Sequence, residues 1–435
     1  MARGNIYAGI DIGTCKVTTI LVSEEEETGK LRVVGVAIEE SRGIRKSQVV
    51  DIEEAIEAIT SSVEAAERMA GFSITHAYVS IGGSHIQSQN SKGVVAVANP
   101  GEEIVADDVS RVIEAARAVS LPSSREILHV IPRDFIVDSQ GGIKDPLSMT
   151  GVRLEVDSHI ITGSSTAIRN LVKCVSEIGI NVTGLVFSGL AASEAVLTDT
   201  EKELGVCLLD IGGGSTNLSV FIEGALSYSG VLPVGAKHIT NDLAIGLRVN
   251  LEEAEKIKLA LSNHPQEELL KDPGKDSDVI DLSKFGISRD LVKPSYKTLV
   301  EGIIRPRLNE IYSMVGEELK KSGLLAATPA GVVLSGGGAL TIKADDACKR
   351  TLSLPVRISG ISQEDISNIK LSGLIDDIGT PRFAVSKGLI FYAVTQNGTS
   401  VSSRLSLPKF GEIIHKFPGR GLLGKGIDFI KSFLP

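Results

Sequence analysis

Two short stretches of the sequence place an aspartate and glycines directly after an apolar segment. The first reads Gly9-Ile-Asp-Ile-Gly-Thr-Cys-Lys16, and the second reads Leu208-Leu-Asp-Ile-Gly-Gly-Gly-Ser-Thr-Asn217. Glycines let backbone amides approach a polyanion because no Cβ intervenes, and successive amides form an anion-binding concavity. We therefore expect both loops to bind phosphate, through Asp11, Gly13, Thr14, Cys15, Lys16, Asp210, Gly212, Gly213, Gly214, Ser215, Thr216 and Asn217.

The two aspartates are also candidates for holding a metal ion. Mg²⁺ keeps several waters and takes few protein carboxylates, so one aspartate from each loop is a suitable pair. We expect Asp11 and Asp210 to hold Mg²⁺ through water while the ion is bound to phosphates. A single Asp-x-Gly is more often a plain turn, but two copies in matching context favour a nucleotide site.

The two loops belong to an internal repeat, because Asp11 and Asp210 are 199 residues apart in matching surroundings. This offset is far longer than a solenoid repeat and predicts two similar α/β halves. Each loop is expected to join two strands, Tyr7–Ile12 with Val17–Val22 and Val206–Asp210 with Asn217–Ile222. A third glycine run, Ser335–Gly338, follows an expected strand over Val332–Leu334.

Other segments have the patterns of helices and strands. Apolar residues recur at helical spacing over Asp51–Ala70, and Gly71 follows as a stop signal. A long amphipathic helix is expected over Leu299–Lys321, and two short strands over Ile127–Pro132 and Asp134–Val137.

Composition narrows the class of protein. The chain of 435 residues has a net charge of −9, which argues against a nucleic-acid binder. Its four cysteines are far apart and form no C-x-x-C pair, so neither a zinc site nor a disulfide framework is expected. The sequence has no run of 18 or more apolar residues, so no membrane span is expected, and its first residues lack the apolar region of a secretory signal. We therefore expect the protein in a reducing cytoplasm.

The glycine segments resemble the two phosphate motifs and the adenosine motif of the superfamily of actin, heat-shock chaperones and sugar kinases. They are Gly9–Val22, Leu208–Phe221 and Val332–Ala339, and the resemblance implies ATP and Mg²⁺ as ligands. Ala254–Ser262 is similar to the chaperone helix that holds ribose and adenine, although a solvated face with charges three residues apart is the alternative. The implied adenosine-binding residues are Glu255, Lys258, Ser262, Gly336, Gly337, Gly338 and Ala339.

From about residue 5 to 434 the chain resembles the FtsA family of bacterial cell division proteins. The likeness is specific around Thr198–Cys207 and Arg305–Ile311, and an insert follows Gly82-Gly83. It implies an α/β, actin-like (ribonuclease H-like) two-lobed fold with an inserted 1C subdomain and a C-terminal amphipathic helix. The implied divisions are 1A at 1–83 and 162–203, 1C at 84–161, 2A at 204–250 and 330–379, 2B at 251–329, a return to 1A at 380–396, a linker at 397–418 and the helix at 419–435.

One position departs from the hydrolytic members of the superfamily. In the chaperones and in MreB a glutamate on the connecting helix positions the attacking water, and that place falls on Gly189 here. Glu194 lies more than a turn later, so whether it or another residue positions a water stays open. Without a placed base, hydrolysis is expected to be slow at most, and ATP is expected to act as an assembly switch.

The family resemblance also implies partners. FtsA proteins bind the C-terminal tail of the tubulin-like protein FtsZ on subdomain 2B, where Arg307 and Asn309 match, although a surface arginine on an amphipathic helix is the alternative. Arginine suits a carboxylate because its fork binds bidentately. The family further implies actin-like filaments of the chain itself and contacts of 1C with other division proteins.

The C-terminus has the pattern of an amphipathic helix. Leu423, Ile427, Ile430 and Leu434 form one helical stripe, and a helix over 420–434 is too short to span a membrane. We expect it to lie in the plane of the inner face of the cytoplasmic membrane and to prefer anionic lipid. A helix docked on its own body is the alternative. The expected membrane residues are Leu422, Leu423, Lys425, Ile427, Phe429, Ile430, Lys431, Phe433 and Leu434.

The favoured interpretation is an ATP-binding, actin-like division protein that polymerises at the membrane, at the division site, and tethers FtsZ there. A PilM-like pilus assembly protein and an actin-fold sugar kinase are the alternatives. The amphipathic tail favours the first interpretation over both.

Overall fold

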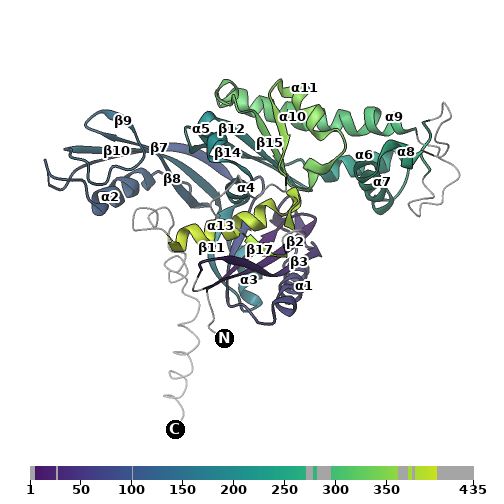
Figure 1. Cartoon of the computed structure of the whole chain (residues 1–435), viewed down its shortest axis with the longest axis horizontal. Coiled ribbons are helices and arrows are strands. Elements are labelled where there is room, and N and C mark those ends of the chain that lie inside the picture. The colour runs from purple at the N-terminus through teal and green to yellow at the C-terminus, as the bar shows by residue number, and fades with distance from the viewer. Residues whose placement is uncertain are drawn as a thin grey trace, which may run out of the picture.

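The structure is a computed structural model that describes residues 5–398, apart from 26–27, 100, 271–277, 282–294, 361–370 and 375–377. The linker beyond 398 and the membrane helix expected at 419–435 lie outside the described residues. No helix in the described part of the chain is long and apolar enough to cross a membrane. Figure 1 shows two central lobes, with the insert containing α2 at one end and α7 and α8 at the other.

The first lobe is a six-stranded sheet in the order β11-β6-β1-β2-β3-β17. Helices α1 (Ile52–Ala70) and α3 (Ser165–Glu177) pack together beside this sheet, and α4 (Ser188–Val196) packs against α13 (Ala384–Gly398). Gly71 ends α1 in the left-handed region, as the sequence predicts, whereas Asp51, expected as the first helical residue, is its N-cap. The strands are β1 (Ile6–Ile12), β2 (Lys16–Glu24), β3 (Leu31–Glu40), β6 (His76–Ile81), β11 (Asn181–Phe187) and β17 (Leu371–Gly373).

The second lobe repeats the central arrangement of the first. Its sheet has the order β14-β13-β12-β15-β16. In each lobe the first strand is antiparallel to the second, which is antiparallel to the third, and the first is parallel to the strand on its other side. The predicted duplication is therefore confirmed. The strands are β12 (Val206–Ile211), β13 (Thr216–Ile222), β14 (Ala225–Leu232), β15 (Val332–Ser335) and β16 (Val356–Ile358).

Helices extend the second lobe. The helix expected from Leu299 begins one turn earlier as α9 (Tyr296–Leu299) and continues through a π-helical turn (Val300–Ile304) into α10 (Arg305–Lys321). The core beneath it is apolar and includes the fully buried Tyr312. The other helices are α5 (Asp199–Leu204), α6 (Ala236–Leu247), α7 (Leu251–Asn263), α8 (Gln266–Leu269) and α11 (Ala344–Leu352).

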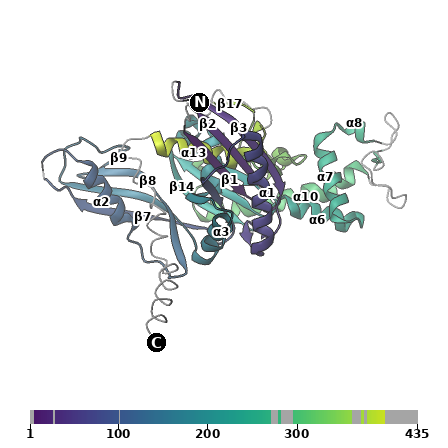
Figure 2. The ribbon, with the colours of Figure 1, turned by 90° about the horizontal axis from the view of Figure 1, so that it is seen from below.

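The insert is a separate small sheet with its own apolar core (Figure 2). It consists of β7 (Gln87–Ala96), α2 (Ala106–Arg117), β8 (Arg125–Val137), β9 (Gln140–Ile143) and β10 (Arg153–Ser164), with strand order β7-β10-β8-β9. The expected pair of strands over 127–137 is wrong, because β8 is one strand that bulges beside Pro132. A bulge lets the strand continue past a residue that cannot donate to the ladder.

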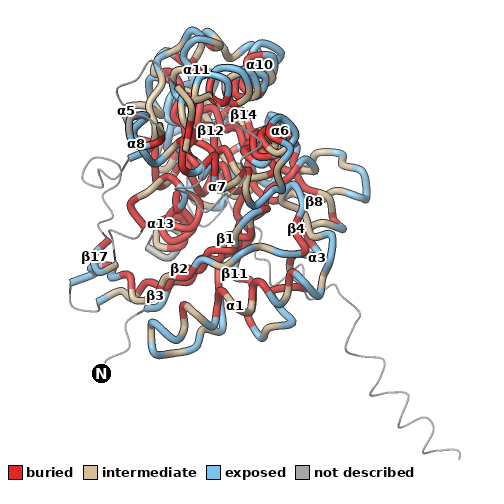
Figure 3. The backbone as a smooth tube through the Cα atoms, turned by 90° about the vertical axis from the view of Figure 1, so that its right-hand side faces the viewer, coloured by how far each residue is buried: buried red, intermediate tan, exposed pale blue. Residues whose placement is uncertain are grey.

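Helix α13 is mostly buried and crosses the middle of the molecule (Figure 3). At its crossing with α4, a Cβ on Gly388 would lie only 1.7 Å from the carbonyl oxygen of Ala191, so the glycine permits this close approach. The same helix packs Ser386 and Leu389 against Gly9 of β1. It ends at Gly398, one residue past the expected start of the linker.

Candidate nucleotide-binding site

The two glycine loops, one from each lobe, lie against each other. Each loop closes with the same backbone hydrogen bond, from Gly13 to Lys16 (3.0 Å) and from Gly212 to Ser215 (2.9 Å). A Cβ built on Gly213 would lie 2.1 Å from Cys15 Sγ, and one on Gly214 would lie 2.8 Å from Thr14 Oγ1. The duplication therefore brings the two predicted phosphate loops into direct contact, and any ligand between them must separate Cys15 from Gly213.

The two aspartates lie at the strand ends that face this contact. Ser80 Oγ donates to Asp11 Oδ1 at 2.8 Å, and Asn217 Nδ2 donates to Asp210 Oδ2 at 2.9 Å. Burial raises the pKa of Asp210 to about 6, the Asn217 hydrogen bond opposes this, and the charge of Asp11 adds to it. Burial also raises the pKa of Asp11, whereas the charge of Lys16 and the hydrogen bond from Ser80 lower it. Because the charge of Asp11 acts on Asp210, the two carboxyls are close enough to interact.

Lysine side chains balance these carboxyls. Lys16 donates to the carbonyl of Arg382 and lies 5.0 Å from the ring centroid of Phe383. Burial lowers the pKa of Lys16, and the charge of Asp11 opposes that shift. The pKa of Cys15 is raised by desolvation, which the charge of Lys237 opposes most strongly. The sequence did not indicate Lys237, which lies at the start of α6 and whose amide donates to the carbonyl of Gly213 in the second loop at 2.8 Å.

The predicted ribose residues are brought together on α7. The ammonium of Lys258 is 2.7 Å from Glu255 Oε2 and 2.9 Å from Thr240 Oγ1. Thr240 donates to the same glutamate oxygen at 2.5 Å. Lys258 is buried, whereas the side chain of Glu255 is 41% exposed, and the two form an ion pair three residues apart. The charges of Glu255 and Lys258 both act on Cys15, which places the cluster near the first loop.

The third glycine run lies beside the second loop. Gly336 has φ 78°, and a Cβ there would meet Asp210 Oδ1 at 2.5 Å, so only glycine fits. A Cβ on Gly338 would meet Ile211 at 2.3 Å, whereas one on Gly337 would meet nothing within 4 Å. Ser262 Oγ accepts from the backbone amide of Ile342 at 3.1 Å, which links α7 to the segment after this run. Ala339 is fully buried.

Two predicted phosphate residues have other local roles. Thr216 Oγ1 donates to the carbonyl of Val234 at 2.8 Å and is fully buried. Asn217 Oδ1 is buried without a hydrogen-bond partner, although its amide nitrogen is bound to Asp210. An unpaired buried acceptor is costly and suits a donor such as a metal-bound water.

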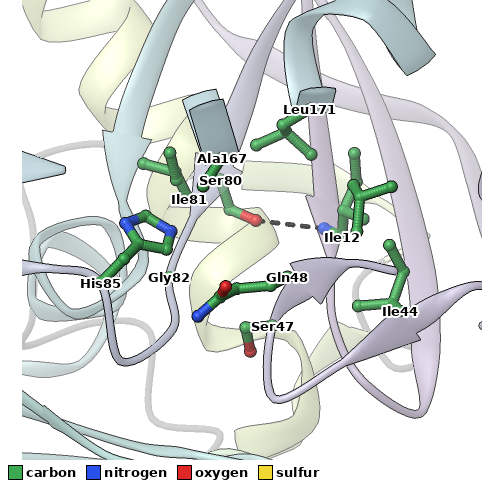
Figure 4. A pocket seen from close by; sticks show the side chains of 11 residues that line it. Ile12, Ile44, Ser47, Gln48, Ser80, Ile81, Gly82, His85, Ala167 and Leu171 are labelled. Atoms are coloured by element: carbon green, nitrogen blue, oxygen red, sulfur yellow. Dashed lines mark hydrogen bonds between the residues drawn. The ribbon is translucent and has the colours of Figure 1, made fainter. Parts of the chain in front are cut away.

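The hairpin β4 (Ile44–Arg45) and β5 (Gln48–Val49) also reaches this site, which the sequence did not suggest. The amide of Ser47 donates to Thr14 Oγ1 at 2.9 Å. Figure 4 shows Ser47 and Gln48 near Ser80 and Gly82, around a cavity of about 10 Å³.

The connecting helix α4 has no room for a larger residue at the position of the missing glutamate. A Cβ on Gly189 would lie 2.4 Å from Ser219 Oγ and 2.7 Å from the Phe187 ring. Glu194 is instead 3.3 Å from the ammonium of Lys202.

The arginine expected to bind the FtsZ tail has partners within the chain. Arg307 donates to both carboxylate oxygens of Asp242, at 2.6 and 2.9 Å, and to Glu310 at 2.6 Å. Hydrogen bonding to Asp242 raises the pKa of Arg307. Asn309 Oδ1 accepts from Thr351 at 3.4 Å. A peptide carboxylate would therefore compete with Asp242 for this fork.

A duplicated pair of lobes with facing glycine loops defines an actin-like, nucleotide-binding protein. The fold is similar to that of a solved PilM–PilN type IV pilus biogenesis complex (TM-score 0.61, 16% identity, 89% of this chain and 98% of that chain). It is also similar to MreB5 of Spiroplasma citri bound to ADP (TM-score 0.50, 14% identity, 90% and 98%). At these identities the likeness is one of fold alone.

Sequence similarity identifies the family. A family model described as the SHS2 domain inserted in FTSA matches residues 83–162, and one described as Cell division protein FtsA matches 207–388. FtsA of Pseudomonas aeruginosa is 36% identical over 403 residues, covering 93% of each chain. FtsA of Borreliella burgdorferi is 39% identical over 389 residues, covering 89% of this chain and 91% of that protein.

The chain belongs to the FtsA family of actin-like cell division proteins. The predicted family, the actin-like fold and its insert are confirmed, and the PilM alternative is set aside because that likeness is structural only.

Proposed function

We propose that this chain binds Mg-ATP between its lobes, assembles into filaments, and ties the FtsZ tail to the inner face of the cytoplasmic membrane. The observation that carries the proposal is the contact of two equivalent glycine loops in a member of the FtsA family, each preceded by an aspartate at the end of a strand. Assembly links many tails, so weak individual membrane contacts add up to strong attachment.

The residues at the loops fit a magnesium-bound polyphosphate. Backbone amides of the two loops and the ammonium of Lys16 would hold the phosphates once Cys15 is separated from Gly213, since glycine has no Cβ to block their approach. Asp11 and Asp210 would hold waters of the metal, and the unpaired Asn217 Oδ1 could accept from one of them. Bound Mg²⁺ would supply positive charge that neutralises the phosphates and the paired carboxyls.

The adenosine would lie against α7 and the third glycine run. The Glu255–Lys258–Thr240 cluster offers the acceptor and donors that ribose hydroxyls need. Gly337 leaves open space for a flat base, because a Cβ there would meet nothing within 4 Å, and Ser262 fixes the adjoining segment.

ATP would serve assembly more than turnover. Gly189 cannot be replaced by a glutamate without displacing Ser219 or Phe187, and Glu194 is already paired with Lys202. The described residues thus supply no free carboxylate at either position, and slow hydrolysis follows.

The tethering function can be tested directly. A fluorescent peptide of the FtsZ C-terminal tail should sediment with anionic vesicles only when the full chain and Mg-ATP are added. Peptide that binds the chain in solution, yet never sediments with vesicles, would disprove the tether.

Replacing Asp242 with asparagine should strengthen binding of the FtsZ tail peptide. The substitution frees the Arg307 fork from its bidentate partner, at an expected gain of about two- to fivefold for an ion pair of this exposure. Arg307→Ala should weaken the same binding by about tenfold, as for an interface arginine. Fluorescence anisotropy measures both.

Arg68→Ala is the matched control, because Arg68 forms an exposed ion pair with Glu64 on α1, in the other lobe. If all three variants bind the peptide like the unaltered chain, Arg307 is not the docking residue.

A further inference from the structure

The turn of the β4–β5 hairpin has an unusual backbone. Lys46 and Ser47 have φ values of 49° and 58°, in the left-handed region that glycine occupies without steric cost. Neither residue is glycine, asparagine or aspartate, the types that adopt this conformation most readily. The turn therefore keeps a serine where local backbone preference alone would select another residue.

The polar groups of Ser47 join the phosphate loops of both lobes. Its amide donates to Thr14 Oγ1 of the first loop at 2.9 Å, and its Oγ is 2.9 Å from Ser215 Oγ of the second loop. The preceding Lys46 Cα would lie 3.2 Å from a Cβ on Gly214. Thr14 and Ser215 are both buried.

The backbone at Gly83 packs closely against the hairpin turn that carries Ser47. A Cβ on Gly83 would lie 2.9 Å from the carbonyl oxygen of Lys46 and 3.2 Å from that of Ser47. A Cβ on Gly82 would lie 3.6 Å from both Ser47 Cβ and Asn217 Oδ1. Figure 4 shows Ser47 beneath Gly82 and Gln48.

We propose that Ser47 is a positioning residue for the polyphosphate: its amide and hydroxyl hold the loops of the two lobes in register, so that one ligand contacts both. A polyphosphate gains affinity from two loops on separate lobes only if both loops present their hydrogen-bond donors at the same place. From a third segment of the chain, Ser47 reaches the first loop with its backbone amide and the second loop with its hydroxyl. This inference rests on the proposed nucleotide-binding function and adds a residue to it.

The test compares three variants of the full chain. Ser47→Ala and Ser47→Gly both remove the hydroxyl, but glycine relieves the left-handed backbone and alanine does not. Lys46→Gly relieves the neighbouring position and keeps the hydroxyl. Affinities for ATP and AMP, with Mg²⁺, are measured by competition against a fluorescent ATP analogue.

Both Ser47 variants should bind ATP about fivefold more weakly, the loss expected for one hydrogen bond, with AMP unchanged. Lys46→Gly should match the unaltered chain for both nucleotides. Equal losses for ATP and AMP would show a merely structural role, and unchanged ATP affinity would overturn the proposal. An unaltered chain that binds neither nucleotide would overturn the proposed function itself, and the role of Ser47 with it.

Discussion

A chain that ends at Phe417 should lose its binding to anionic vesicles, while the full chain sediments with them. The removed segment holds the apolar stripe and three cations, Arg420, Lys425 and Lys431. At about 1 kcal/mol for each cation near an anionic surface, charge alone would account for roughly a hundredfold in affinity. Mg-ATP should strengthen binding of the full chain only, because assembly multiplies the tails. Salt should weaken it, because salt screens the attraction between cations and an anionic surface.

Two substitutions at neighbouring positions distinguish the effect of the apolar stripe from the effect of shortening the chain. Ile427→Asp places a charge on the stripe and should abolish vesicle binding, whereas Asp428→Asn, one residue later and off the stripe, should preserve it. Binding that survives both the truncation and Ile427→Asp would place the membrane contact elsewhere in the chain.

Asp210→Asn should stabilise the chain at neutral pH and abolish its magnesium-dependent ATP binding. Burial raises the pKa of Asp210 from 3.8 to about 6, so at pH 7 the folded chain holds a carboxylate whose charged form is disfavoured. Asparagine removes that charge and should add on the order of 2 kcal/mol to the free energy of unfolding. The same change removes the group that would hold the metal's water.

The stability gained by Asp210→Asn should depend on pH. Because the pKa of Asp210 is higher in the folded chain, the protonated carboxyl contributes to the stability of the fold. This contribution is fully present below pH 3.8 and is lost as the pH rises through about 6. The gain from Asp210→Asn should therefore appear in thermal unfolding at pH 7 and vanish near pH 4. Magnesium-dependent ATP binding by the unaltered chain, measured by calorimetry, should fall as the pH drops through about 6.

Glu194→Gln is the control, since it removes a carboxylate that pairs with Lys202 outside the loops. It should leave Mg-ATP binding and phosphate release unchanged. Magnesium-dependent binding retained in Asp210→Asn would exclude Asp210 from the metal site.

Local patterns were enough to predict the duplicated lobes. The two Asp-Ile-Gly loops, the end of α1 at Gly71 and the strand hairpins depend on neighbouring residues, and these features are where the sequence places them. The β8 bulge was missed because Pro132 ends a strand by local rules, while pairing with β10 on one side lets it continue.

Long-range partners were not predictable. Asp242 meets Arg307 across 65 positions of sequence, and Ser47 meets Ser215 across 168. No periodicity links such residues, and only the packing of α6 on α10, or of the hairpin on the loops, brings them together. The Lys46-Ser47 turn also lacks the glycine or asparagine that would have marked a left-handed turn in the sequence.

Helix α13 has a mechanical consequence for any load on the C-terminus. The chain beyond Gly398 continues directly from a buried helix that is wedged against Ala191 at Gly388 and against Gly9 at Leu389. Just before that helix, the carbonyl of Arg382 receives the hydrogen bond of Lys16, in the first phosphate loop. Tension applied to the tail would thus be transmitted along α13 to the first glycine loop, and would act on the two lobes at the place where they meet.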